Sequence, residues 1–231
     1  MGVTRHVVGP IMAFAALGAL SACDSDDFVN VITPIATTLT INAPSDGQTG
    51  VVGQALATPL SVHVTDVRGN AVAGATVSWA VVGGGGTLSA ATSVSDLSGD
   101  ATIVWTLPNL AGAYQVQASL ANGNSVTFNA TATAAAATAL QLISGDNQGV
   151  PAGTATQAMV IRAVDQFGNP VAGVSIAWST TGGGALNVTS GLTDAAGNAQ
   201  VTLTTSGAAG PFTVTASSGT LTPIVFNGIG S

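Results

Sequence analysis

The chain has 231 residues, of which 46% are hydrophobic and only 6% are charged. It contains no lysine or glutamate, three arginines and ten aspartates, and its net charge is −7. This composition excludes the basic surface that binding to nucleic acid requires and disfavours attraction to anionic lipid. Polar Thr, Ser, Asn and Gln must therefore provide solubility, which favours β-strands over helices.

Residues 1–22 are predicted to be a lipoprotein signal peptide. The apolar stretch Val7–Leu20 is shorter than the roughly 20 residues of a membrane-spanning helix. It leads to Leu20–Ser21–Ala22–Cys23, which resembles a bacterial lipobox and contains the only cysteine of the chain. We expect lipid attachment at Cys23; a plain secretory signal with an incidental cysteine is the alternative. The expected location is the bacterial cell envelope, with the outer membrane or cell surface favoured, although Asp24 leaves the inner membrane open.

A tether over residues 23–35 precedes a module of about a hundred residues that occurs twice. Asp66–Gly74, followed by Trp79, returns 99 residues later as Asp165–Gly173, followed by Trp178. Such a repeat indicates tandem domains. We place the first domain at residues 36–133, a linker at 134–137 and the second domain at 138–231.

Short runs of alternating apolar residues predict β-strands in both units, because side chains at every second position face the same side of a sheet. The fold class is therefore all-β, with two tandem β-sandwiches after the signal peptide. The tryptophans Trp79 and Trp178 are predicted to lie in the two cores, with ligand stacking as the alternative. The alternating sets are Val62/Val64, Ala75/Val77/Trp79/Val81, Ala101/Ile103/Trp105/Leu107 and Tyr114/Val116/Ala118, then Ile161/Ala163, Val174/Ile176/Trp178, Ala199/Val201/Leu203 and Phe212/Val214/Ala216.

Together these motifs resemble the bacterial Ig-like group 1 domain. They are D-x-x-G-N-x-V-x-G, a tryptophan on the next strand, a D-x-x-G-x-A turn and an aromatic strand ending in V-x-A. That domain builds the extracellular rods of invasin and intimin, so the resemblance implies immunoglobulin-like sandwiches on a bacterial surface. It covers about residues 36–133 and 137–231. We expect the second module to end at Ser231 without the lectin-like domain that binds the host receptor in some relatives.

Three Asp–Asn pairs suggest either a calcium loop or a turn held by side-chain hydrogen bonds. None offers the several carboxylates of a strong calcium site, so turn formation is the better interpretation and no metal or cofactor is predicted. The steps Gly69–Asn70 and Gly168–Asn169 supply residues that tolerate positive φ in a tight connection, and the glycine runs Gly83–Gly86 and Gly182–Gly184 are expected to be strand connections. The pairs are Asp66/Asn70, Asp165/Asn169 and Asp194/Asn198.

Catalysis is not expected, because His63 is the only histidine after Cys23. A hydrolase would need a Ser–His–Asp set built around His63, with Asp66 as its nearby carboxylate, yet the second unit has Arg162 at the equivalent position. The predicted function is a lipid-anchored spacer or interaction and adhesion module. Its expected partners are the membrane, through lipid on Cys23, and a protein or glycan; nucleic acid is not expected. The alternatives are a carbohydrate- or host-binding adhesin using Gly182–Leu186 and Gly207–Phe212, and an accessory subunit of a larger envelope assembly.

Overall fold

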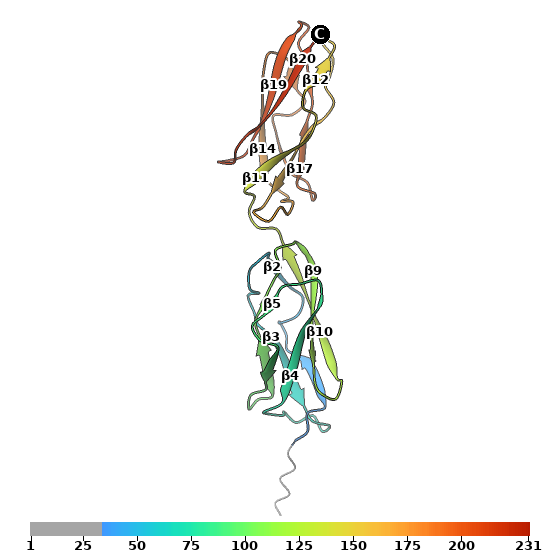
Figure 1. Cartoon of the computed structure of the whole chain (residues 1–231), viewed down its shortest axis with the longest axis vertical. Coiled ribbons are helices and arrows are strands. Elements are labelled where there is room, and N and C mark those ends of the chain that lie inside the picture. Colours follow the sequence, from blue (N-terminus) through green and yellow to red (C-terminus); the bar gives the residue numbers. More distant parts are fainter. Residues whose placement is uncertain (1–33) are drawn as a thin grey trace, which may run out of the picture. The chain divides into compact units, whose positions relative to one another are not determined.

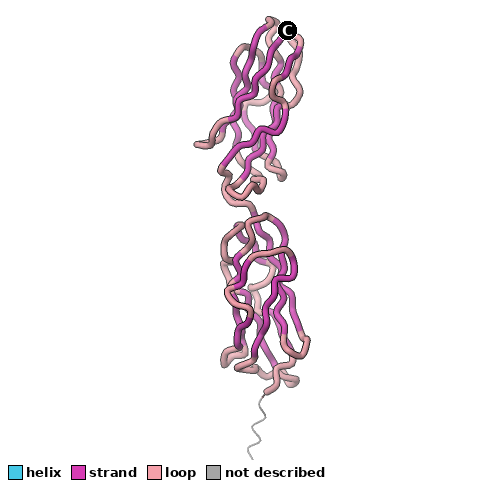
Figure 2. Tube along the Cα trace, viewed as in Figure 1, coloured by secondary structure: helices cyan, strands magenta, loops and turns pink. Residues whose placement is uncertain are grey.

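The computed structural model describes residues 34–231, so the predicted signal peptide, Cys23 and nearly all of the tether lie outside the described residues. Residues 34–231 consist of strands and loops without a helix (Figure 2), and hence contain no helix long and apolar enough to cross a membrane. The all-β class predicted from the alternating pattern is confirmed.

The first module, coloured blue to green in Figure 1, is a sandwich of a three-stranded and a five-stranded sheet. The strand orders are β1-β3-β7 and β2-β10-β9-β4-β6, and a small β5-β8 pair completes the module. All pairs are antiparallel except β2 with β10. The bounds are β1 Thr38–Ile41, β2 Gln48–Val51, β3 Leu60–Thr65, β4 Thr76–Gly83, β5 Thr87–Leu88, β6 Thr92–Val94, β7 Asp100–Ile103, β8 Trp105–Thr106, β9 Gly112–Ser119 and β10 Ser125–Thr133.

The second module, coloured yellow to red in Figure 1, has the same topology, with orders β11-β13-β17, β12-β20-β19-β14-β16 and β15-β18. The duplicated sequence motifs thus correspond to duplicated strand pairings. The bounds are β11 Ala139–Ser144, β12 Gln148–Val150, β13 Met159–Val164, β14 Ser175–Thr181, β15 Ala185–Leu186, β16 Ser190–Leu192, β17 Asn198–Val201, β18 Leu203–Thr204, β19 Gly210–Ser217 and β20 Ile224–Gly230.

Each core is built around a tryptophan and a phenylalanine of the five-stranded sheet, from β4 and β10 in the first module and from β14 and β20 in the second. Trp79 and Phe128 have ring centroids 5.7 Å apart, and the Trp178 and Phe226 centroids are 6.4 Å apart. Both tryptophans are about 95% buried, which confirms their predicted core positions. Buried aromatic pairs of this kind add stabilisation beyond the area they bury.

The predicted strand of Ala101, Ile103, Trp105 and Leu107 is interrupted at Val104, after which the chain changes partner. β7 pairs with β3, whereas β8 pairs with β5. The four inward side chains remain buried across the break, so the period of two persists while the hydrogen bonding changes sheet. The same break separates β17 from β18.

The last residues of β10 lie directly before the segment that joins the two modules. Ala132 and Thr133 belong to β10, where Ala132 pairs with Gly112 and is almost fully buried. The segment between β10 and β11 comprises residues 134–138.

Candidate functional site

The loop after β13 is held by the side chain of Asp165. Its Oδ1 accepts hydrogen bonds from the backbone N–H groups of Phe167 and Asn169, both at 2.9 Å. The Asn169 amide returns a bond of 2.9 Å to Oδ2 of Asp165. This geometry confirms that the Asp–Asn pair forms a turn through its own side chains.

Of the two residues of the Gly–Asn step, which both tolerate positive φ, only the glycine adopts it. Gly168 has a φ of 85°, but Asn147 is the one residue other than glycine with positive φ among residues 34–231. Asn169 therefore contributes through its side-chain amide, because its backbone lies in the ordinary region. The same holds for Gly69, with a φ of 83°, and Asn70.

The Asp165 loop also bonds to the first module and the linker. The Asn169 amide donates to the carbonyl oxygen of Asn109 at 2.8 Å, and its oxygen accepts from the N–H of Ala111 at 2.9 Å. The N–H of Ala135 donates to Oδ2 of Asp165 at 3.0 Å. Asp165 and Asn169 are only 3% and 1% exposed. A turn of the second module thus provides its hydrogen-bonded connection to the first.

The equivalent loop of the first module has the same internal bonds but is exposed. Oδ1 of Asp66 accepts from the N–H of Arg68 at 2.8 Å and of Asn70 at 2.9 Å, and the Asn70 amide donates to Oδ2 at 3.0 Å. Its neighbour Val67 is 86% exposed. The connecting role of the loop is therefore specific to the second copy within residues 34–231.

The two aspartates remain carboxylates for different reasons. The hydrogen bond from the Asn70 side chain is the main cause that lowers the pKa of Asp66. Burial is the largest single influence on the pKa of Asp165 and raises it, but the hydrogen bonds from Asn169, Ala135 and Phe167 together outweigh burial and lower the pKa.

The Ser–His–Asp geometry that a hydrolase would need around His63 is not formed with Asp66. Nδ1 of His63 instead lies 2.8 Å from Oδ1 of Asp100 on β7, and that hydrogen bond, with one from Asn42, lowers the pKa of Asp100. The second module has Arg162 bonded to Asn198 in the equivalent places, at 3.0 Å. Both pairs therefore link neighbouring strands of the three-stranded sheet.

A metal centre receives no support from clustering of ligands. Within residues 34–231, no group of three or more His, Cys, Asp or Glu side chains lies close enough to hold a metal ion.

The glycine run Gly182–Gly184 adopts positive φ throughout, as expected for a strand connection. A Cβ on Gly182 would lie 2.8 Å from Cα of Phe212, and one on Gly183 would lie 3.3 Å from Oγ of Ser206. The structure thus brings together the β14–β15 and β18–β19 loops, which overlap the two segments of the adhesin alternative, Gly182–Leu186 and Gly207–Phe212. A ligand there remains a prediction.

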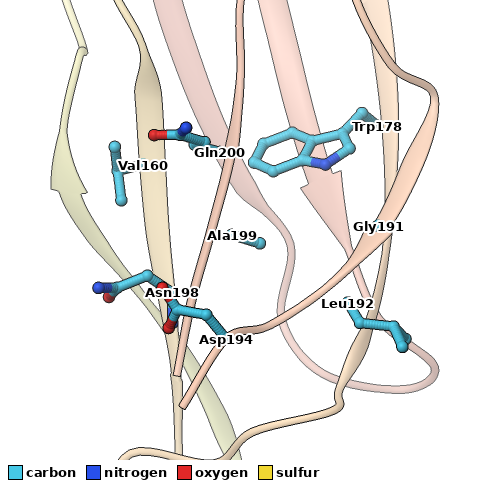
Figure 3. A pocket seen from close by; sticks show the side chains of 8 residues that line it. All are labelled: Val160, Trp178, Gly191, Leu192, Asp194, Asn198, Ala199 and Gln200. Atoms are coloured by element: carbon cyan, nitrogen blue, oxygen red, sulfur yellow. The ribbon is translucent and has the colours of Figure 1, made fainter. Parts of the chain in front are cut away.

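A pocket of about 390 Å³ lies elsewhere in the second module, between edge strand β16 of one sheet and edge strand β17 of the other. Figure 3 shows the Trp178 indole on one side and the Asp194, Asn198 and Gln200 side chains around the opening. Sequence reasoning missed this pocket. The only sign of the pocket in the sequence is a difference at one equivalent position, which is Ser93 in the first copy and Gly191 in the second. Its lining residues are Val160, Trp178, Gly191, Leu192, Asp194, Asn198, Ala199 and Gln200.

Solved structures with a similar fold include a bacterial adhesin. FdeC, an Escherichia coli adhesin, is 22% identical over 85% of this chain and 65% of its own, with a TM-score of 0.60. Yersinia pseudotuberculosis InvD is 18% identical over 85% of this chain and 58% of its own, with a TM-score of 0.53. The D0–D1 fragment of intimin is 24% identical over 84% of this chain and 95% of the fragment, with a TM-score of 0.35.

The similarities to FdeC and InvD show the fold, and the chain spans only about three fifths of those two structures. A comparison with curated proteins found no match. The family model for the bacterial Ig-like domain (group 1) matches twice, at residues 36–135 and 139–225. The two matches cover both sandwiches, and the chain therefore belongs to the bacterial Ig-like domain (group 1) family.

Proposed function

We propose that this chain is a lipid-anchored protein of a bacterial cell envelope, whose two Ig-like domains serve as a spacer and interaction module. The lipobox-like Leu20–Cys23 supports the anchor, with Cys23 as the lipid attachment residue and residues 23–35 as the tether. The family match supports a surface location, since FdeC, which shares the fold, is an adhesin. The outer membrane or cell surface is the favoured location.

The observation that carries the spacer role is the hydrogen bonding of Asn169 and Asp165 to the first module and the linker. A spacer transmits position only if its modules resist independent movement. Three bonds from two nearly inaccessible side chains restrain the connection, because each would otherwise leave a polar group without a partner. The proposed boundaries are residues 36–133, 134–137 and 138–231.

The anchor is tested by metabolic labelling of bacteria that express the chain with a palmitate analogue. The wild type should be labelled and should remain with the membrane fraction, whereas Cys23→Ser should lose both properties. The double variant Cys23→Ser/Ser25→Cys is the matched control, because it retains one thiol two residues further along. Labelling of this control, or of Cys23→Ser, would contradict lipid attachment at Cys23.

Sidedness is tested on intact cells with proteinase K, since Arg68 and Arg162 are the only trypsin sites after Cys23. Digestion of the wild type on intact cells supports surface display. Protection on intact cells, followed by digestion after the outer membrane is opened, would instead place the domains inside that membrane.

A further inference from the structure

The second module has an indole N–H that faces an open pocket. Trp178 is 5% exposed, and its Nε1 donates no hydrogen bond to any of residues 34–231. Figure 3 shows this nitrogen on the ring edge turned toward Gly191 and Leu192, which line the pocket. The nitrogen is not one of the fully buried unpaired polar atoms of residues 34–231, so it is open to the pocket and its hydrogen-bonding capacity is available to a ligand.

The first module shows how the same N–H is satisfied when the pocket is filled. Nε1 of Trp79 donates to Oγ of Ser93 on edge strand β6 at 2.9 Å. Gly191 occupies the equivalent place on β16: Val77 pairs with Ser93, and Ile176 pairs with Gly191. The second copy therefore lacks the hydroxyl that would satisfy its tryptophan.

Backbone geometry does not require glycine at this position. A Cβ on Gly191 would have no heavy atom within 4 Å, and its φ lies outside the positive range. A serine side chain would therefore fit without strain. The glycine keeps space free next to the indole nitrogen.

The other polar groups of the pocket have unused hydrogen-bonding capacity. Oδ1 of Asp194 accepts the N–H groups of Ala196 and Asn198, while Oδ2 has no bond to the rest of residues 34–231. Asn198 accepts from Arg162 through its oxygen, and its amide nitrogen remains free within the same range. The Gln200 amide is exposed and makes no hydrogen bond to described residues. Donors and acceptors thus surround a partly apolar wall of Trp178, Leu192 and Val160.

We propose that this pocket binds a neutral saccharide, with Trp178 Nε1 donating to a ring or hydroxyl oxygen. Hydroxyl groups both donate and accept, which suits a set containing a carboxylate oxygen, two amides and an indole N–H. The volume of about 390 Å³ falls in the range of small-molecule sites, about 300–1,000 Å³. Asp194 is the only charged lining residue and would repel an anion.

This inference deepens the proposed interaction role but does not depend on the lipid anchor. Labelling of Cys23 and sugar binding are separate measurements, so either can fail alone. The pocket is also distinct from the distal loops Gly182–Leu186 and Gly207–Phe212, none of whose residues line it.

The test follows the tryptophan indole N–H resonances of the whole chain by two-dimensional NMR during titration with methyl glucoside, methyl mannoside, methyl galactoside and N-acetylglucosamine. The chain has three tryptophans, so Trp178→Phe identifies the relevant signal. We expect at least one sugar to move the Trp178 resonance saturably. The Trp79 resonance should stay fixed, because its N–H is already bonded to Ser93.

Gly191→Ser should weaken that binding by at least about tenfold, since the new hydroxyl satisfies the indole and fills the pocket. Its melting temperature should not fall, because the site is sterically open. Gln200→Ala, which breaks no internal bond, should also weaken binding, whereas Thr102→Ala at the matching position of the first module should not. The proposal is overturned if none of the sugars shifts the Trp178 resonance even at concentrations well above millimolar. It is also overturned if Gly191→Ser binds the sugar as tightly as the wild type, or if glucuronate binds as tightly as the neutral sugars.

Discussion

Replacing Asn169 by alanine should weaken the connection between the two modules. The substitution removes the donor to the Asn109 carbonyl and the acceptor for the Ala111 N–H, at 2.8 and 2.9 Å, together with the bond to Asp165. Leaving a buried polar group without a partner costs about 1–3 kcal/mol. Water can reach the partly exposed Asn109 and Ala111 groups, so we expect a total loss of about 2–4 kcal/mol.

Asn70→Ala is the matched control, because it breaks the same internal bond in an exposed loop. Its expected cost is at most about 1 kcal/mol. The difference between the two variants, about 1–4 kcal/mol, measures the bonds that cross to the first module.

Both costs can be measured by urea unfolding, and hydrogen exchange at the Ala111 amide locates the effect. This amide should exchange faster in Asn169→Ala and unchanged in Asn70→Ala. Equal unfolding costs for the two variants, with unaltered exchange at Ala111, would show that the cross-module bonds contribute no stability.

Three further predictions concern the same structure. The folded-state pKa of Asp165 lies below its ordinary value of 3.8, so the stability that this carboxylate contributes should be complete above about pH 4 and lost as the pH falls through the folded-state pKa. The free energy of unfolding should therefore fall more steeply with decreasing pH in the wild type than in Asp165→Asn, and equal slopes would contradict this. Trp178→Ala and Trp79→Ala should each cost about 3–5 kcal/mol in urea unfolding, whereas a cost below about 1 kcal/mol would contradict a core position. Gly182→Ala should destabilise the protein by about 1–3 kcal/mol, because the φ of Gly182 is 83° and the new Cβ would press on Phe212. Gly207→Ala, which adds a Cβ in open space, should leave the melting temperature unchanged, and equal effects of the two variants would refute the steric argument.

The sandwich architecture was predictable because its main cause is local. Alternating apolar residues such as Val62 and Val64 specify which face of a strand is buried, and the duplication at Trp79 and Trp178 provided the pattern twice. The break at Val104 was not predictable, since alternation reports burial and not hydrogen-bonding partner.

The functional details depended on contacts between distant residues. Asp66–Asn70 and Asp165–Asn169 form the same turn, and only the three-dimensional arrangement shows that one is exposed while the other bonds to Asn109. The exchange of Ser93 for Gly191 is visible in the sequence, but its meaning requires knowing that this position faces an indole nitrogen.

The polar character of the Asp165 loop affects how such proteins can lengthen during evolution. A repeat whose Asp–Asn turn forms hydrogen bonds to the preceding domain can also be the first domain of an array, because its amide and carboxylate groups are readily hydrated when no domain precedes them. The exposed Asp66 turn is already in that condition. Duplication or loss of one unit would therefore leave no buried polar group without a partner in this turn, and arrays of different lengths could arise without redesign of the repeat.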